Sequence, residues 1–228
     1  MKNSVKPTNN EFVFGCVYYF LQLLIIPVIL VVIMMLLGMS YSEAVINFAY
    51  FAINFVVVTL IFHKFLLENL RLFLAQPWHH LRCAGLGLMM YFAGNVVVSI
   101  LLTLIDPAFA NVNDAAIMEM VQDNFTLMTI GTVLLVPIVE ETFYRGMIFR
   151  MLFDKHPIAA YGLSMAIFSC IHVVGYIGMA DLLTLALCFI QYLPAGFALA
   201  WSYRRSGSIF TSVLIHMSVN QIGMLFMR

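Results

Sequence analysis

Six polar side chains that could do chemistry interrupt apolar stretches of this sequence: Glu140, Glu141, Arg145, His172, His216 and Asn220. A charged side chain at the centre of a membrane helix costs about 2.5 to 3.5 kcal/mol on insertion scales. Such residues usually face the protein interior or a water-filled cavity, where they have functional roles. These six are therefore the candidate site residues.

Helical spacing relates several of these residues to one another. Glu141 and Arg145 are four residues apart, so they share a helix face and can form an ion pair. Glu140 lies about 100° around the same helix and points elsewhere. His216 and Asn220 are also four residues apart and share a face of the last apolar segment.

His172 belongs to a third segment, where it shares a face with Phe168. At a rise of about 1.5 Å per residue, Glu140 and His216 lie about 15 and 12 Å from the basic ends of their segments. His172 lies deeper, at about 22 Å. These depths are compatible with one cluster of polar groups inside the membrane, although they do not require the three helices to touch.

A carboxylate, two imidazoles and an amide together suit the hydrolysis of an amide bond. A carboxylate in a low-dielectric site can act as a general base toward water, and an imidazole can help to hold that water. A second imidazole and an amide can stabilise a developing oxyanion. Glu140, His172 and His216 could instead bind zinc, because two His and one Glu with an open position form a catalytic zinc site. Spacing alone does not choose between these alternatives.

The elements that carry these residues are predicted to be membrane helices. Of the 228 residues, 63% are hydrophobic and only 10% are charged, whereas soluble domains carry about 25% charged residues. A membrane-spanning helix needs about 20 apolar residues. Such segments predict an all-α, polytopic membrane bundle of about seven helices, at residues 12–38, 42–66, 84–105, 125–151, 157–177, 181–202 and 208–227.

The basic residues predict the orientation of the bundle. Of eleven Lys and Arg, all but Arg145 and Arg228 fall at the same ends of the seven segments, and the loops at the other ends contain acidic residues but no Lys or Arg. The positive-inside rule then predicts a cytoplasmic N-terminus. The mixed, aromatic segment 67–83 is predicted to lie along the cytoplasmic interface as an amphipathic helix.

No second domain is expected. Residues 1–228 are predicted to form one integral membrane domain, with N-terminal spans in 1–124 and the catalytic core helices in 125–228. The four cysteines form no CxxC pair and are predicted to be free thiols. A net charge of zero with no basic tract gives no indication of nucleic-acid binding, so the expected partners are the lipid bilayer and a membrane-associated peptide or protein.

Three motifs in the C-terminal half resemble those of a known family. EETFYR (140–145) resembles the E-E-x-x-x-R motif, FSCIH (168–172) the F-x-x-x-H motif and HMSVN (216–220) the H-x-x-x-N/D motif of the CAAX protease and bacteriocin-processing family. All three occur in the family's order, each on a predicted span. The resemblance covers roughly residues 125–228, and better-known relatives have eight spans rather than seven.

The resemblance implies a glutamate-dependent intramembrane endopeptidase, a type often described as a metalloprotease. It implies that Glu140 and His172 activate water, that His216 and Asn220 stabilise the oxyanion, and that Glu141 with Arg145 supports the site. Relatives act on prenylated CAAX proteins or take part in bacteriocin processing and peptide-signal maturation. A compact, Met- and Phe-rich chain of this kind is typical of a bacterial plasma membrane protein.

Two other functions remain open at the level of sequence. The chain could be a non-catalytic membrane immunity or sensor-regulating protein that retains the motifs. It could also be a proton-linked transporter that uses Glu and His as a relay. The intact set of motifs favours the protease.

Overall fold

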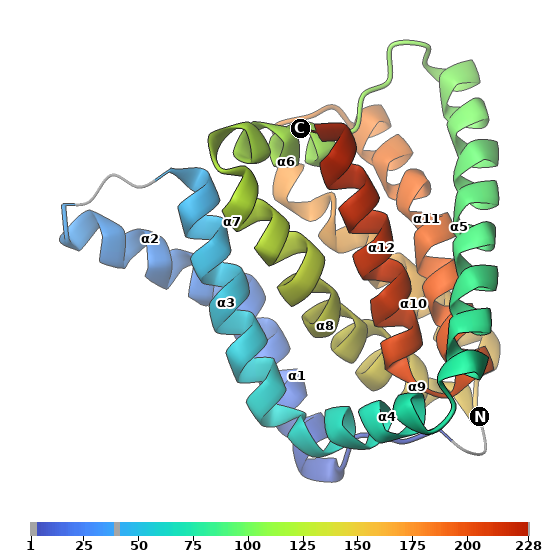
Figure 1. Cartoon of the computed structure of the whole chain (residues 1–228). Helices are drawn as coiled ribbons and strands as arrows, with labels where there is room; N and C mark the ends of the chain where they lie inside the picture. Colours follow the sequence, from blue (N-terminus) through green and yellow to red (C-terminus); the bar gives the residue numbers. More distant parts are fainter. Residues whose placement is uncertain (1–3, 39–41, 228) are drawn as a thin grey trace.

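The computed structural model describes residues 4–38 and 42–227, and in these ranges the chain is a bundle of helices (Figure 1). The N-terminal half contains α1 (Asn9–Leu24), α2 (Ile26–Leu36), α3 (Glu43–Ile61), α4 (His63–Ala75) and α5 (Pro77–Ile105). The C-terminal half contains more and mostly shorter elements: α6 (Val112–Asp123), α7 (Phe125–Thr129), η1 (Ile130–Leu135), α8 (Val136–Glu141), η2 (Thr142–Phe149), α9 (Arg150–Phe153), α10 (Pro157–Ile171), η3 (Val174–Tyr176), α11 (Leu182–Ser206) and α12 (Ile209–Met227).

All seven expected segments are helical, but they are not equally long. Five helical stretches are long and apolar enough to span a membrane, and α1 with α2 forms a sixth if this pair, bent by 47°, is one span. Helix α10 ends at Ile171, six residues earlier than we expected, and its 15 residues extend only about 22 Å. The span predicted over 157–177 was therefore too long, because a turn and the short η3 helix replace its last part.

The fourth expected segment is one long helix with an irregular interior. It runs from Phe125 to Phe153, and two π-helical stretches, η1 and η2, flank α8 within it. Pro137 has no backbone N–H to donate to the preceding turn, which favours the wider turns of η1 just before it. Wide π turns are frequent at functional sites, and here they surround the pair of glutamates.

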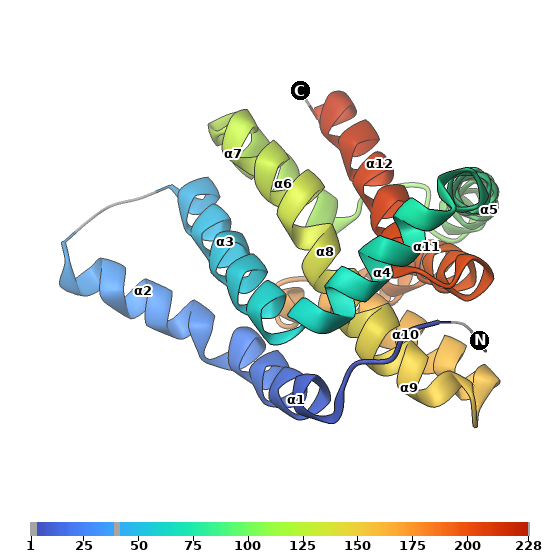
Figure 2. The ribbon, with the colours of Figure 1, turned by 60° about the horizontal axis from the view of Figure 1, so that its bottom comes forward.

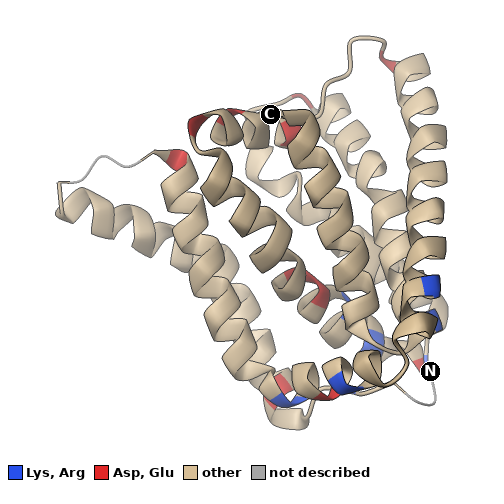
Figure 3. Cartoon of the chain, viewed as in Figure 1, with Lys and Arg blue, Asp and Glu red and all other residues tan. Residues whose placement is uncertain are grey.

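Helix α4 crosses the end of the bundle that carries the basic residues (Figures 1 and 2). The expected amphipathic helix at 67–83 is therefore divided, because residues up to Ala75 belong to α4 and those from Pro77 begin α5. Lys and Arg gather around α4, α9 and the start of α5, which we call the basic end (Figure 3). The opposite end, which we call the acidic end, carries Asp and Glu in its loops.

The N-terminal segment is tied to the basic end by charge. Lys6 Nζ and Arg150 lie 2.9 and 3.0 Å from the Asp154 carboxylate. Hydrogen bonds from Lys6 and Arg150 lower the pKa of Asp154 to about 2. These contacts place the segment before α1 against α9, on the same side as α4.

Helices α1 and α2 diverge from the rest of the bundle. Part of α1 packs on the core, where Gly15 lies against the Phe62 ring so closely that a Cβ would be 2.3 Å from it. None of the residues of α2 is buried, and the helix projects away from its neighbours in two views (Figures 1 and 2). The apolar surface of α2 is consistent with a helix in contact with lipid.

Candidate active site

Four of the six candidate residues line one cavity. Glu140, His172, His216 and Asn220 face a space of about 420 Å³ between α8, α10, α11 and α12. Glu141 and Arg145 are fully buried and do not line it. The structure therefore brings the three predicted polar segments together and separates the two adjacent glutamates, as the 100° turn between them predicts.

Glu141 links two partners behind the cavity. Its Oε1 accepts hydrogen bonds from Arg145 Nη1 at 2.9 Å and from His216 Nδ1 at 3.0 Å. The predicted pairing of Glu141 with Arg145 is thus confirmed, and the contact with His216 adds a second helix, α12. Arg145 also donates to the carbonyl of Gly196 at 3.2 Å and lies over the Phe168 ring at 4.7 Å.

His216 lies between the two carboxylates. Since its Nδ1–H donates to Glu141, its Nε2 is directed toward Glu140, whose Oε2 lies 3.9 Å away. The Glu140 side chain is 18% exposed, and its Oε2 accepts no hydrogen bond from any residue that the structure describes. A buried carboxylate oxygen without a protein donor is a site for water or a substrate group.

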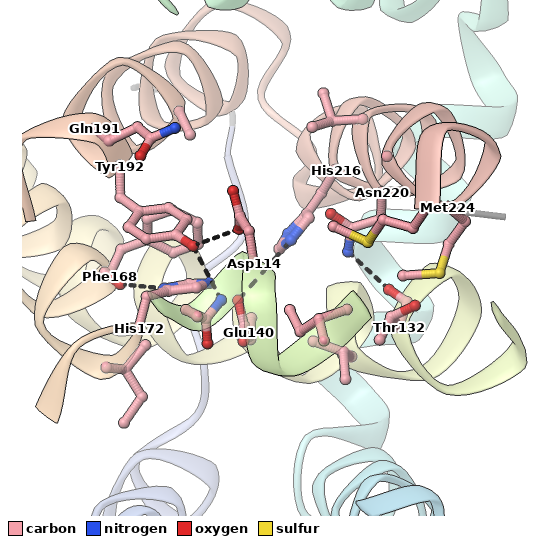
Figure 4. A pocket seen from close by; sticks show the side chains of 18 of the residues that line it. Asp114, Thr132, Glu140, Phe168, His172, Gln191, Tyr192, His216, Asn220 and Met224 are labelled. Atoms are coloured by element: carbon pink, nitrogen blue, oxygen red, sulfur yellow. Dashed lines mark hydrogen bonds and ion pairs between the residues drawn. The ribbon is translucent and has the colours of Figure 1, made fainter. Parts of the chain in front are cut away.

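His172 reaches the cavity from a position just past the end of α10. Its Nδ1 lies 2.7 Å from the carbonyl oxygen of Phe168. A carbonyl only accepts, so the proton is on Nδ1 and the Nε2 of a neutral ring is an acceptor. The ring also stacks on Tyr192, with 4.2 Å between the centroids (Figure 4).

Asn220 is fixed by the π-helical part of the long helix. Its Nδ2 donates to the carbonyl of Thr132 at 2.7 Å, and Thr132 lies in η1 (Figure 4). An amide nitrogen has two hydrogens, so one remains for a ligand in the cavity. The predicted role of Asn220 at an oxyanion is compatible with this geometry and stays a prediction.

The same region of the chain matches a known family. Residues 122–222 match the family described as type II CAAX prenyl endopeptidase Rce1-like. Residues 122–222 belong to this family. No curated protein and no solved structure matches the chain. The match supports a membrane-embedded protease at a general level and includes all six candidate residues.

Helices outside the Rce1-like region complete the cavity. Asn113 and Asp114 of α6 line it, and they contact Tyr192 of α11. Burial raises the pKa of Asp114 above its ordinary value, although the hydrogen bond from Tyr192 opposes this change. Sequence reasoning missed these residues, because Asp114 resembles an ordinary loop acid and Tyr192 an ordinary aromatic residue of a span.

The cavity extends toward the acidic end of the bundle. Its lining residues include those of α6 and of the end of α12, which lie at that end (Figure 1). No residue of α4 or α9 lines it among those that the structure describes.

A second cavity reaches Glu140 from another direction. It has a volume of about 450 Å³ and lies between α1, α2, α3 and α8. Its walls are mostly apolar and include Leu23, Leu30 and Val31. Glu140 and Val136 line both cavities, so Glu140 lies where a polar space and an apolar space adjoin.

The zinc alternative does not fit this arrangement. Within residues 4–38 and 42–227, no three His, Cys, Asp or Glu side chains lie close enough together to hold one metal ion. Each histidine uses Nδ1 elsewhere, His216 at Glu141 and His172 at a backbone carbonyl, so only their Nε2 atoms could be ligands. Glu140, His172 and His216 share a cavity but do not converge as ligands of one ion.

Proposed function

We propose that this chain hydrolyses a peptide bond of a membrane-associated peptide or protein, with Glu140 as the general base. The observation that carries the proposal is the position of Glu140, which lines the cavity and whose Oε2 has no donor among the described residues and lies 3.9 Å from His216 Nε2. A water molecule at this oxygen would lie in the cavity that His172 and Asn220 also line.

The proton inventory supports a general-base mechanism. Glu140 would take one proton from the water as the water oxygen attacks the carbonyl carbon of the substrate. Glu140 would then pass that proton to the departing amine. The Nε2 acceptor of His172 would orient the other hydrogen of the water. The remaining N–H of Asn220, and His216 when its Nε2 carries a proton, would donate to the oxyanion.

The apolar cavity supports a substrate that is presented from the bilayer. The cavity is lined by residues of α2, a helix with no buried residue, and by Glu140. A hydrophobic segment or a lipid-modified residue next to the cleaved bond would suit these walls. Prenylated CAAX proteins and bacteriocin-like or signal-like peptides are both candidates, and a matched pair of peptides with and without the lipid separates them.

The test is cleavage by protein in lipid nanodiscs and in cells. Glu140→Gln keeps the size of the side chain but removes the base, and His172→Ala removes the proposed orienting group. Both are expected to lower the rate by at least about 100-fold, as loss of a general base typically does. The exposed Glu68→Gln is the matched control and should cleave normally.

Mass spectrometry of membrane-associated peptides would identify the substrate. Fragments that appear with the native chain and disappear with Glu140→Gln are the expected products. Normal cleavage by Glu140→Gln would rule out the mechanism. An unchanged cellular phenotype in both variants would favour the non-catalytic immunity or sensor-regulating function. Activity that survives thorough chelation would support hydrolysis by Glu and His without zinc.

A further inference from the structure

We propose that Tyr192 and the first turn of α6 are positioning residues for His172, so that the active site is complete only when α6 is seated. The proposal rests on the proposed function, because it concerns the residue that would orient the attacking water. It assigns a role to a segment that precedes the Rce1-like region.

His172 needs positioning from outside its own helix. It is the residue directly after α10, and a turn follows it. Among the described residues the ring has one hydrogen bond, from Nδ1 to the carbonyl of Phe168. This bond limits rotation of the ring about Cβ–Cγ, and the stacked Tyr192 ring, 4.2 Å away, restricts the rotation further.

Tyr192 is held in turn by α6. Its hydroxyl accepts a hydrogen bond from Asn113 Nδ2 at 2.9 Å and donates one to Asp114 Oδ1 at 3.0 Å (Figure 4). Both bonds are partly buried, and a buried polar group that loses its partner is costly. The tyrosine therefore keeps one orientation only while the start of α6 lies beside it.

Two further contacts connect the same three segments. Asn111, the N-cap of α6, donates to Gln191 Oε1 at 2.8 Å, directly beside Tyr192. Tyr176, in the turn after His172, donates to Asn113 Oδ1 at 3.4 Å. One connected network thus joins three segments at the acidic end of the cavity: the turn that carries His172, the helix that carries Tyr192 and the start of α6.

A displacement of α6 would therefore loosen His172 although α6 need not touch the substrate. A misplacement of about 1 Å in a reacting group can reduce a rate about 100-fold. The consequence is a separable effect: variants of Tyr192 should lower kcat while KM stays close to that of the native chain. A merely structural aromatic residue would not produce this separation.

The test compares Tyr192→Leu with Tyr192→Phe in nanodiscs. Tyr192→Leu removes the stacked ring and is expected to lower kcat by about 10- to 100-fold. Tyr192→Phe keeps the ring and loses the hydrogen bonds, so we expect a loss of about two- to tenfold. The control is Tyr161→Leu, which removes a tyrosine of α10 that contacts Phe149 edge-to-face and lines neither cavity. Its kcat per folded molecule should stay within twofold of the native value.

Two variants of Asp114 test the link through α6. Asp114→Asn keeps an oxygen that can accept from the Tyr192 hydroxyl and should retain most of the kcat, whereas Asp114→Ala should match Tyr192→Phe. Equal kcat in Asp114→Ala and the native chain, or a kcat of Tyr192→Leu within twofold of native, would overturn the proposal.

A spectroscopic measurement keeps the proposal testable apart from catalysis. In protein labelled at histidine, the ring signals of His172 are assigned with His172→Gln. These signals should move in Tyr192→Leu, because the ring current of the tyrosine is lost, and should stay in place in Tyr161→Leu. Unmoved signals would contradict the stacking. If the signals move but the native chain cleaves no peptide, the proposed function fails and the positioning of His172 stands.

Discussion

Glu140 and Glu141 are adjacent in the chain but their carboxylates lie in different environments. Glu141 is fully buried and receives hydrogen bonds from Arg145 and His216. Each carboxylate keeps one oxygen without a donor among the described residues, but only Glu140 faces a cavity. A buried charge is tolerated because an opposite charge accompanies it, and removal of one partner leaves the other uncompensated. The first glutamate is thus available for chemistry and the second is needed for stability.

This difference predicts that the same substitution changes stability much more at Glu141 than at Glu140. Glu141→Gln leaves the buried guanidinium of Arg145 without its counter-ion and should destabilise the protein by about 3 to 5 kcal/mol. Glu140→Gln breaks no hydrogen bond at Oε2 to a described residue, loses only a 3.9 Å contact with His216, and should change stability by less than about 1 kcal/mol. Thermal and denaturant-induced unfolding in detergent measures the stability of both variants. Equal losses of stability would contradict the separate roles.

At the residue scale, sequence predicts local pairs better than distant ones. The ion pair of Glu141 and Arg145 follows from a spacing of four on one helix and is confirmed. The contact of Glu141 with His216 joins positions 75 apart, and that of Asp114 with Tyr192 joins positions 78 apart. No spacing rule relates such positions, so their contacts depend on how the helices pack.

At the scale of elements, close packing between α10 and α11 supports the site. Gly196 of α11 lies against α10, where an added Cβ would be 3.1 Å from the Met165 Cα. The carbonyl of this same glycine accepts a hydrogen bond from Arg145. Any separation of the two helices would therefore also move the group that holds Arg145, and with it Glu141.

We expect Gly196→Ala to lower both stability and activity. The backbone of Met165 must shift to admit the methyl group, at a cost of about 1 to 3 kcal/mol for overpacking. Gly162→Ala, on α10 with no atom within 4 Å of the added Cβ, is the matched control. It should be neutral or stabilising, because alanine is favoured over glycine in helices by about 1 kcal/mol. Thermal unfolding and cleavage rates of both variants measure the contrast, and equal behaviour would show that this contact is unimportant.

Helices were predicted well where the length of an apolar segment determines them, and poorly where turns determine their ends. The helical segments around 42–66, 84–105 and 208–227 follow from hydropathy and occur as α3, α5 and α12, with shifted ends. The π turns around α8 and the early end of α10 do not alter hydropathy, so they could not be predicted from it. The role of α6 was missed for the same reason, since a short polar helix resembles a loop.

At the scale of the whole molecule, the separation of charge makes the orientation testable. The basic end carries α4, the segment before α1 and the loop around Lys155 (Figure 3). The acidic end carries α6 and the loop after α5. The positive-inside rule predicts that the basic end faces the cytoplasm. Because α6 borders the polar cavity, this orientation would place that end of the active site toward the outer surface.

Labelling of single cysteines measures the orientation directly. The native cysteines carry no disulfide within the described residues, so they can be replaced without loss of a covalent link; they are Cys16, Cys83, Cys170 and Cys188. In that background, Ala108→Cys reports on the acidic end and Lys155→Cys on the basic end, and both positions are exposed. A membrane-impermeant maleimide should label residue 108 in intact cells of a bacterial host and residue 155 only after lysis.

The outcome decides which substrates can reach the polar side of Glu140. Labelling of residue 108 from outside would favour peptides that arrive through the bilayer or at its outer face, where α6 would have to accommodate their polar end. Labelling of residue 155 in intact cells instead would show that the bundle has the reverse orientation, and would favour cytoplasmic substrates. Because both cavities meet at Glu140, the chemistry is the same in either case, and only the source of the substrate changes.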